Sequence, residues 1–115
     1  MRYTNDLAFS AVAVESTDVI NSDWIDASSM FQVSVQVVTA GSNPTGALKL
    51  QFSDDNPTHG DPSNASDVTS ATVSTTTNGV YAIQKTEICA MWVRLVYTNS
   101  SGSGTVTARL KSNGA

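Results

Sequence analysis

Residues with the chemistry of metal ligands gather in one stretch of the chain, Ser53–Asp67, which reads SDDNPTHGDPSNASD. It offers hard oxygen ligands of the kind that calcium takes, at Asp54, Asp55, Asn56, Asp61 and Asp67. Their spacing matches no EF-hand motif, and two prolines already restrict the backbone. We therefore expect an exposed loop whose aspartates hold no structural metal, and a chain that needs no cofactor.

The sequence contains few of the residues that known catalytic arrangements need. His59 is the only histidine, so a His-rich metal site is excluded, and a Ser-His-Asp triad would depend on one base in that loop. Paired carboxylates for sugar hydrolysis would come from Glu15, Glu87 and the loop aspartates. Such a pair must be fixed across a cleft, for which a domain of this size has little room. We expect that the protein is not an enzyme.

Composition narrows the possible partners. The 115 residues fit one domain, and charged residues make up 14%, against about 25% in an average protein. The net charge is −4, and the six Lys and Arg are scattered, which argues against nucleic acid as a partner. No apolar run reaches the ~20 residues of a membrane helix, so we expect no membrane partner. Cys89 is alone and no signal-peptide pattern opens the chain, which predicts synthesis in a reducing cytoplasm.

Strand patterns dominate the rest of the sequence. FQVSVQVV, ALKLQFS and TVTARLK alternate between apolar and polar residues, while MWVRLVYT is apolar on both faces. Weaker strands are expected at Ala8–Val14, Ser22–Asp26, Val68–Thr75 and Val80–Gln84. About eight short strands predict an all-β, single-domain antiparallel β-sandwich. Its core is predicted at Phe31, Val33, Val35, Val37, Leu48, Leu50, Phe52, Val93, Leu95, Val106 and Leu110.

Turn residues separate these strands. TAGSNPTG (Thr39–Gly46) is predicted as a turn that joins two strong strands, because Gly, Asn and Pro supply special backbone geometry, and NSSGSG (Asn99–Gly104) as the turn of a closing β-hairpin. Thr77–Gly79 is predicted as a tight hairpin turn. Residues 1–6 precede the first alternating run, and we expect them to form an N-terminal arm that the fold does not need.

Three segments together resemble small virion proteins of tailed bacteriophages: DWIDASSMFQVSVQVV, PTGALKLQFSDDNPT and MWVRLVYTNSSGSGTVTARLKSNGA. The resemblance spans roughly Trp24 to Gly114. The chain departs from the pattern in the middle, where NPTHGDPSNASD stands in place of a shorter turn. The resemblance implies a jelly-roll-like sandwich that decorates or cements the icosahedral head. The implied partners are the major capsid protein and neighbouring copies of the chain, on the capsid exterior after synthesis in the host cytoplasm.

A cement protein requires contact surfaces rather than a pocket. The arm suits such a contact, since Tyr and Arg are favoured at interface hot spots, and the two turn segments suit it as exposed projections. The predicted interface residues are Arg2, Tyr3, Asn5, Trp24, Asn43, Pro44, Ser101 and Ser103. The alternative is a ligand-binding module, such as a carbohydrate-binding one, of a phage tail or adhesion apparatus, which would be favoured if Trp24 and Tyr81 formed a flat platform near the acidic loop.

Overall fold

The computed structural model describes residues 3–27, 32–54, 65–86, 90 and 92–113, and among these it contains strands and their connections only. No helix in these ranges is long and apolar enough to cross a membrane. The expected all-β antiparallel class is confirmed. The strands are β1 (Tyr3–Val14), β2 (Val19–Asn21), β3 (Ile25–Asp26), β4 (Gln32–Ser53), β5 (Ser66–Thr75), β6 (Gly79–Thr86) and β7 (Trp92–Asn113).

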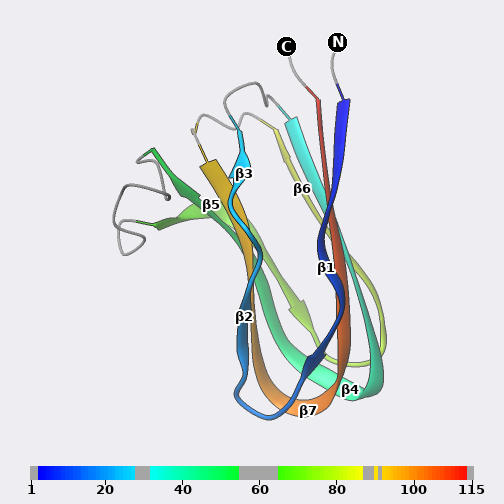
Figure 1. The fold of residues 1–115 in the computed structure, drawn as a ribbon. Helices are drawn as coiled ribbons and strands as arrows, with labels where there is room; N and C mark the ends of the chain where they lie inside the picture. The colour runs from blue at the N-terminus through cyan, green and yellow to red at the C-terminus, as the bar shows by residue number, and fades with distance from the viewer. Residues whose placement is uncertain (1–2, 28–31, 55–64, 87–89, 91, 114–115) are drawn as a thin grey trace.

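Two strands of 22 residues each, β4 and β7, form the framework. They pair antiparallel from Gln32–Asn113 to Ser53–Trp92, and both turn back together at the end of the molecule opposite the termini (Figure 1). The folded ribbon therefore contributes to two layers. The first layer has the order β1, β7, β4, β6, and the second has β2 and β3, then β7, β4 and β5. A paired ribbon folded over itself gives the expected jelly-roll-like sandwich.

The predicted turns are wrong in one respect. Thr39–Gly46 and Asn99–Gly104 lie within β4 and β7, and they reverse the chain from one layer to the other instead of within a sheet. Positive φ angles at Gly41, Asn43, Gly102 and Gly104, with register shifts after Ser42, bend the strands without ending their pairing. Thr77–Gly79 also joins the layers, because β5 and β6 pair with different halves of β4.

The core lies between the layers. Nine of the predicted core residues are buried: Val33, Val35, Val37, Leu48, Leu50, Val93, Leu95, Val106 and Leu110. Phe52 is only half-buried, and Phe31 lies outside the described residues. Phe9, Val14 and Tyr97 are also buried there, although they were not among the predicted residues.

The N-terminal arm is a wrong prediction for residues 3–6. They begin β1, where Tyr3 pairs with Asn113 and Asp6 with Leu110 (Figure 1). Pairing through the backbone needs no apolar alternation, so this part of the strand carried little signal in the sequence. Residues 1 and 2 lie outside the described part of the chain.

Candidate functional site

The structure places the predicted interface residues in three regions. Asn43, Pro44, Ser101 and Ser103 come together where β4 and β7 turn back, since Ser42 pairs with Ser103 and Thr45 with Ser101. Tyr3 and Asn5 lie at the opposite end of the molecule, in β1, and Trp24 lies between β2 and β3. Arg2 lies outside the described residues. We call residues 15–18, 39–46, 75–79 and 99–104 the fold-over end.

The bend of β4 is tied to the link between β5 and β6. The backbone N–H of Asn78 donates to Asn43 Oδ1 at 3.1 Å, and Asn78 Nδ2 donates to the Gly41 carbonyl at 2.8 Å. The Thr45 hydroxyl also donates a hydrogen bond to the Thr76 carbonyl, at 3.0 Å, which joins the same two segments. Asn43 therefore has a structural role as well as an exposed surface. Pro44 is buried, which leaves it little surface for contact with a neighbouring chain.

A buried polar chain lies beneath the fold-over end. Thr75 and Tyr97 are 0% exposed and Asn99 is 1% exposed. The Gly46 amide donates to Thr75 Oγ1 at 3.1 Å, Thr75 Oγ1 lies 3.0 Å from the Tyr97 hydroxyl, and that hydroxyl donates to Asn99 Oδ1 at 3.1 Å. An amide oxygen can only accept, so Tyr97 must donate to Asn99 and accept from Thr75.

The same hydrogen-bonded side chains also contact the other two segments of the fold-over end, residues 15–18 and 99–104. Asn99 Nδ2 donates to the carbonyls of Glu15 and Gly102, each at 2.9 Å, and the Asn99 amide donates to the Asp18 carbonyl at 2.8 Å. The four segments of the fold-over end are thereby fixed relative to one another. Nothing in the sequence indicates that Thr75, Tyr97 and Asn99 interact, because Tyr97 lies in an apolar run and Asn99 in a turn-like stretch. That Thr75, Tyr97 and Asn99 are buried together can be seen only in the folded structure.

The side chain of Tyr81, on β6, hydrogen-bonds the backbone of the segment that connects β5 and β6. Its hydroxyl accepts from the amides of Thr76 and Thr77, both at 3.2 Å, and donates to the Thr77 carbonyl at 2.8 Å. The hydrogen bonds from the Thr77 and Thr76 amides lower the pKa of Tyr81 to about 8. Tyr81 lies in the first layer and Trp24 beside the second, so they do not form the common platform that would have favoured the carbohydrate alternative.

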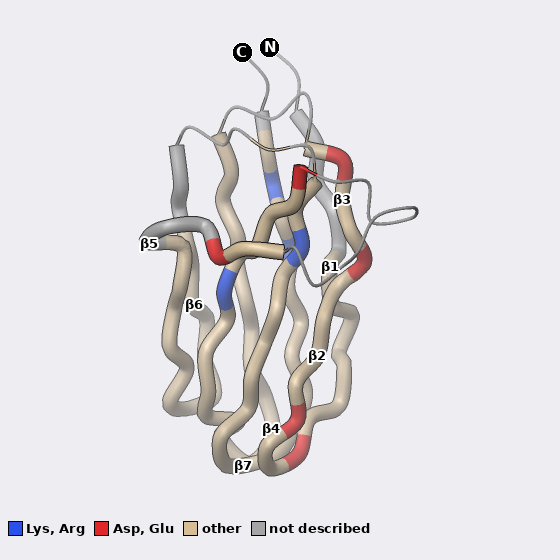
Figure 2. The backbone as a smooth tube through the Cα atoms, turned by 90° about the vertical axis from the view of Figure 1, so that its left-hand side faces the viewer, with Lys and Arg blue, Asp and Glu red and all other residues tan. Residues whose placement is uncertain are grey.

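The surface of the fold-over end is polar and carries no cation. Its exposed residues include Ser42, Asn43, Thr77, Asn78 and Ser101. Its two charged residues, Glu15 and Asp18, are acidic, and the blue Lys and Arg positions in Figure 2 all lie away from this end. Preorganised hydroxyl and amide groups of this kind can hydrogen-bond a neighbouring protein without pairing buried charges.

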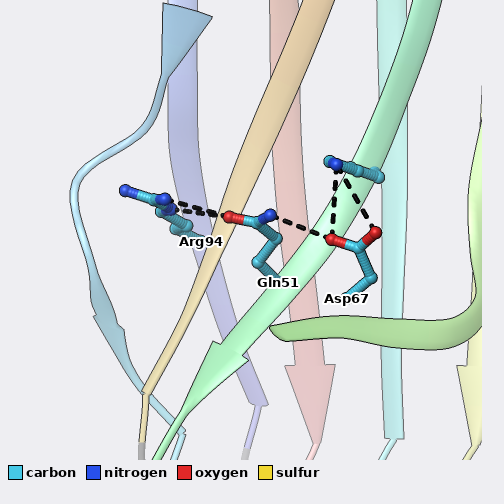
Figure 3. A network of polar contacts seen from close by, with 4 residues as sticks. Gln51, Asp67 and Arg94 are labelled. Atoms are coloured by element: carbon cyan, nitrogen blue, oxygen red, sulfur yellow. Dashed lines mark hydrogen bonds and ion pairs between the residues drawn. The ribbon is translucent and has the colours of Figure 1, made fainter. Parts of the chain in front are cut away.

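A second polar group crosses the outer face of the second layer (Figure 3). Arg94 Nε and Nη2 donate to Gln51 Oε1 at 3.1 and 3.0 Å, and Gln51 Nε2 donates to Asp67 Oδ1 at 2.9 Å. Lys49 Nζ lies 3.3 Å from the same carboxylate. The Gln51 amide, followed by Lys49, holds the pKa of Asp67 below its ordinary value.

Trp24 ends this row of side chains. The Arg94 guanidinium carbon lies 4.7 Å from the centre of the half-buried Trp24 ring, a cation–π contact. We call Trp24, Arg94, Gln51, Asp67 and Lys49 the outer row. It combines an aromatic ring with hydrogen-bonding groups on neighbouring strands, which is a surface chemistry that sugars can use.

The acidic stretch is only partly described. Asp54 is exposed, residues 55–64 lie outside the described residues, and Asp67 belongs to β5 rather than to a loop. Among the residues that can be described, no cluster of His, Cys, Asp and Glu could hold a metal ion. The expectation that the loop aspartates bind no metal stays a prediction.

No protein-family model matches the sequence, and a comparison with curated proteins finds no match. The fold is similar to that of PBSX exported protein XepA, with a TM-score of 0.74 and 12% identity over 97% of the chain. The chain spans only 37% of that protein. It is also similar to SPBc2 prophage-derived protein YomS, with a TM-score of 0.58 and 12% identity, covering 96% of this chain and 92% of the other.

Similar folds also occur in other contexts. The infectious bursal disease virus VP2 subviral particle gives a TM-score of 0.59 at 11% identity, covering 96% of this chain and 32% of the other. The C-terminal CBM6 of LamC from Zobellia galactanivorans gives 0.55 at 9% identity, covering 95% and 98%. At these identities the likeness shows the fold alone, and function must be argued from the surface.

Proposed function

We propose that the protein is a structural component of a phage virion that decorates or cements the icosahedral capsid. In this proposal it binds subunits of the major capsid protein, and neighbouring copies of itself, on the capsid exterior after synthesis in the host cytoplasm. No catalytic step is assigned to it.

The fold-over end is the observation that carries this proposal. The four segments of the fold-over end present exposed Ser, Thr and Asn side chains. The buried, hydrogen-bonded side chains of Thr75, Tyr97 and Asn99 hold these segments in place. Groups that are ordered before binding lose little conformational entropy when a partner docks, so a modest polar surface can bind firmly. The fold-over end carries only two charged side chains, both carboxylates, so electrostatic repulsion between neighbouring copies at this end is small.

The comparisons support the proposal. A prophage-derived protein of nearly the same length and a viral VP2 particle share the fold. The sequence resemblance to small virion proteins of tailed phages points in the same direction.

The test uses heads of the phage that encodes the chain, purified without this protein. Ser101→Arg places a bulky cation on the exposed fold-over end, and Ser66→Arg makes the same change at an exposed position where β5 begins, at the other end of the sandwich. We expect Ser101→Arg to weaken co-sedimentation with heads at least tenfold, while Ser66→Arg binds like wild type. Equal binding by both variants would remove the fold-over end from the proposal.

A second candidate function, carbohydrate binding, is favoured by the outer row. Trp24 is half-buried and stands beside Arg94, Gln51 and Asp67, and a CBM6 domain shares the fold. Against it, Arg94 already covers one face of the ring and the row satisfies its own polar groups. A glycan array probed with wild type and Trp24→Ala distinguishes the two functions, since only a sugar-binding protein would give signals that the variant loses.

A further inference from the structure

The four edges of the sandwich, formed by β1, β6, β5 and the two short strands β2 and β3, differ in how they are protected against pairing with another chain. β2 and β3 have three and two residues, and β1 has register shifts between Leu7 and Val12, with a positive φ at Ala11. β5 has a register shift opposite Lys49–Gln51 and an exposed Asp67 in an ion pair. Short strands, bulges and charges are the usual means of preventing edge-to-edge association.

β6 has fewer of these protections. Its eight residues, GVYAIQKT, pair with β4 without a register shift, from Thr39–Gly79 to Gln32–Thr86. Within the part of the chain that the structure describes, no strand pairs with its other edge. One charged residue, Lys85, stands near its end.

The apolar surface is concentrated at the same edge. Val80 is 60% exposed and lies opposite Val38, which is 40% exposed, and Ala82 is exposed as well. Among the described residues only three large hydrophobic side chains are exposed, and two of them form this cross-strand pair; the third, Val19, lies on β2.

We propose that β6 pairs antiparallel with β6 of a second copy, so that the first layers of two molecules form one continuous sheet. The edge is complementary to itself: a two-fold axis near Tyr81–Ile83 keeps the two Lys85 residues at opposite ends of the pair. Each Val80 then lies beside the β6 strand of the second copy, which removes part of its apolar surface from water. This surface is distinct from the fold-over end, and the inference does not depend on capsid binding.

The association should be weak in free solution. Two eight-residue strands bury well under the ~1,600 Å² of a standard interface, so we expect a dissociation constant on the order of 10–100 μM. Sedimentation velocity of the purified chain without heads, across that concentration range, measures it. We expect wild type to shift from monomer to dimer and Val80→Lys to weaken the dimer at least tenfold, because a lysine at the edge opposes strand pairing.

Val19→Lys is the matched control, since Val19 is 56% exposed on the β2 edge of the other layer. It should dimerise like wild type. Ala82→Lys serves as a second β6 variant should Val80→Lys melt early. Hydrogen exchange should show β6 amides gaining protection as protein concentration rises. A wild type that stays monomeric at about ten times the expected constant, or a Val19→Lys effect as large as that of Val80→Lys, would overturn the inference.

Discussion

Removing one hydroxyl, in Tyr97→Phe, tests the buried chain beneath the fold-over end. The hydroxyl accepts from Thr75 and donates to Asn99 Oδ1, and all three side chains are at most 1% exposed. In the variant, Thr75 keeps only the more distant Pro44 carbonyl, at 3.4 Å, as an acceptor, and Asn99 Oδ1 loses its donor in a place that water does not reach. A buried acceptor without a donor costs about 1–3 kcal/mol in addition to the lost hydrogen bond, so we expect unfolding to become easier by about 2–3 kcal/mol.

Thermal unfolding followed by circular dichroism measures this loss, which should lower Tm by about 6–12 °C in a domain of this size. Tyr81→Phe is the matched control, because its hydroxyl bonds exposed amides that water can satisfy. We expect it to cost less than about 1 kcal/mol. The reasoning is wrong if Tyr97→Phe melts within about 2 °C of wild type, or no lower than Tyr81→Phe.

Four further results are expected. Val35→Asp, which puts an unpaired charge at a site 1% exposed, should cost several kcal/mol of a total of ~5–15 and leave little folded protein by circular dichroism; a melt near wild type would show that the register is wrong. Deleting residues 1–6 should destabilise the domain by about 2–4 kcal/mol in urea titration, because Tyr3–Asp6 pair with Leu110–Asn113; unchanged stability would restore the idea of a dispensable arm. Ultraviolet titration should show one tyrosine ionising near pH 8, absent in Tyr81→Phe, and stability should rise between about pH 8 and 10, where the unfolded chain binds more protons; the absence of any tyrosine ionisation near pH 8 would contradict this. Chelator treatment should leave Tm unchanged, and a large drop would indicate that the Ser53–Asp67 stretch holds calcium.

Much of the sandwich could be predicted from alternation. Val33, Val35 and Val37 share a face because side chains alternate along a strand, and one buried face fixes the register. The path of β4 and β7 could not be predicted, because Gly, Asn and Pro give the same signal for a turn that ends a strand and for a bend within it. The difference lies in the partner strand, which bends at the same place and keeps its pairing on both sides.

The candidate surface was predicted in part. The exposed Asn43 and Ser101 and the half-buried Ser103 were predicted from turn composition, which indicates surface positions whether or not the strand ends there. The buried partners that hold them, Tyr97 and Asn99, could not be identified, since their hydrogen bonds join residues far apart in sequence, such as Asn99 to Glu15. The outer row depends in the same way on three strands being adjacent.

Capsid binding is the central claim, and the number of copies bound per head tests it most directly. Purified chain is added in excess to heads that lack it, unbound protein is removed by sedimentation, and bound copies are counted against the major capsid protein by quantitative mass spectrometry. The account predicts saturation at a fixed ratio to the capsid subunits, with that ratio lost in Ser101→Arg and retained in Ser66→Arg. Binding that never saturates, or no binding above that of an unrelated β-sandwich, would contradict it.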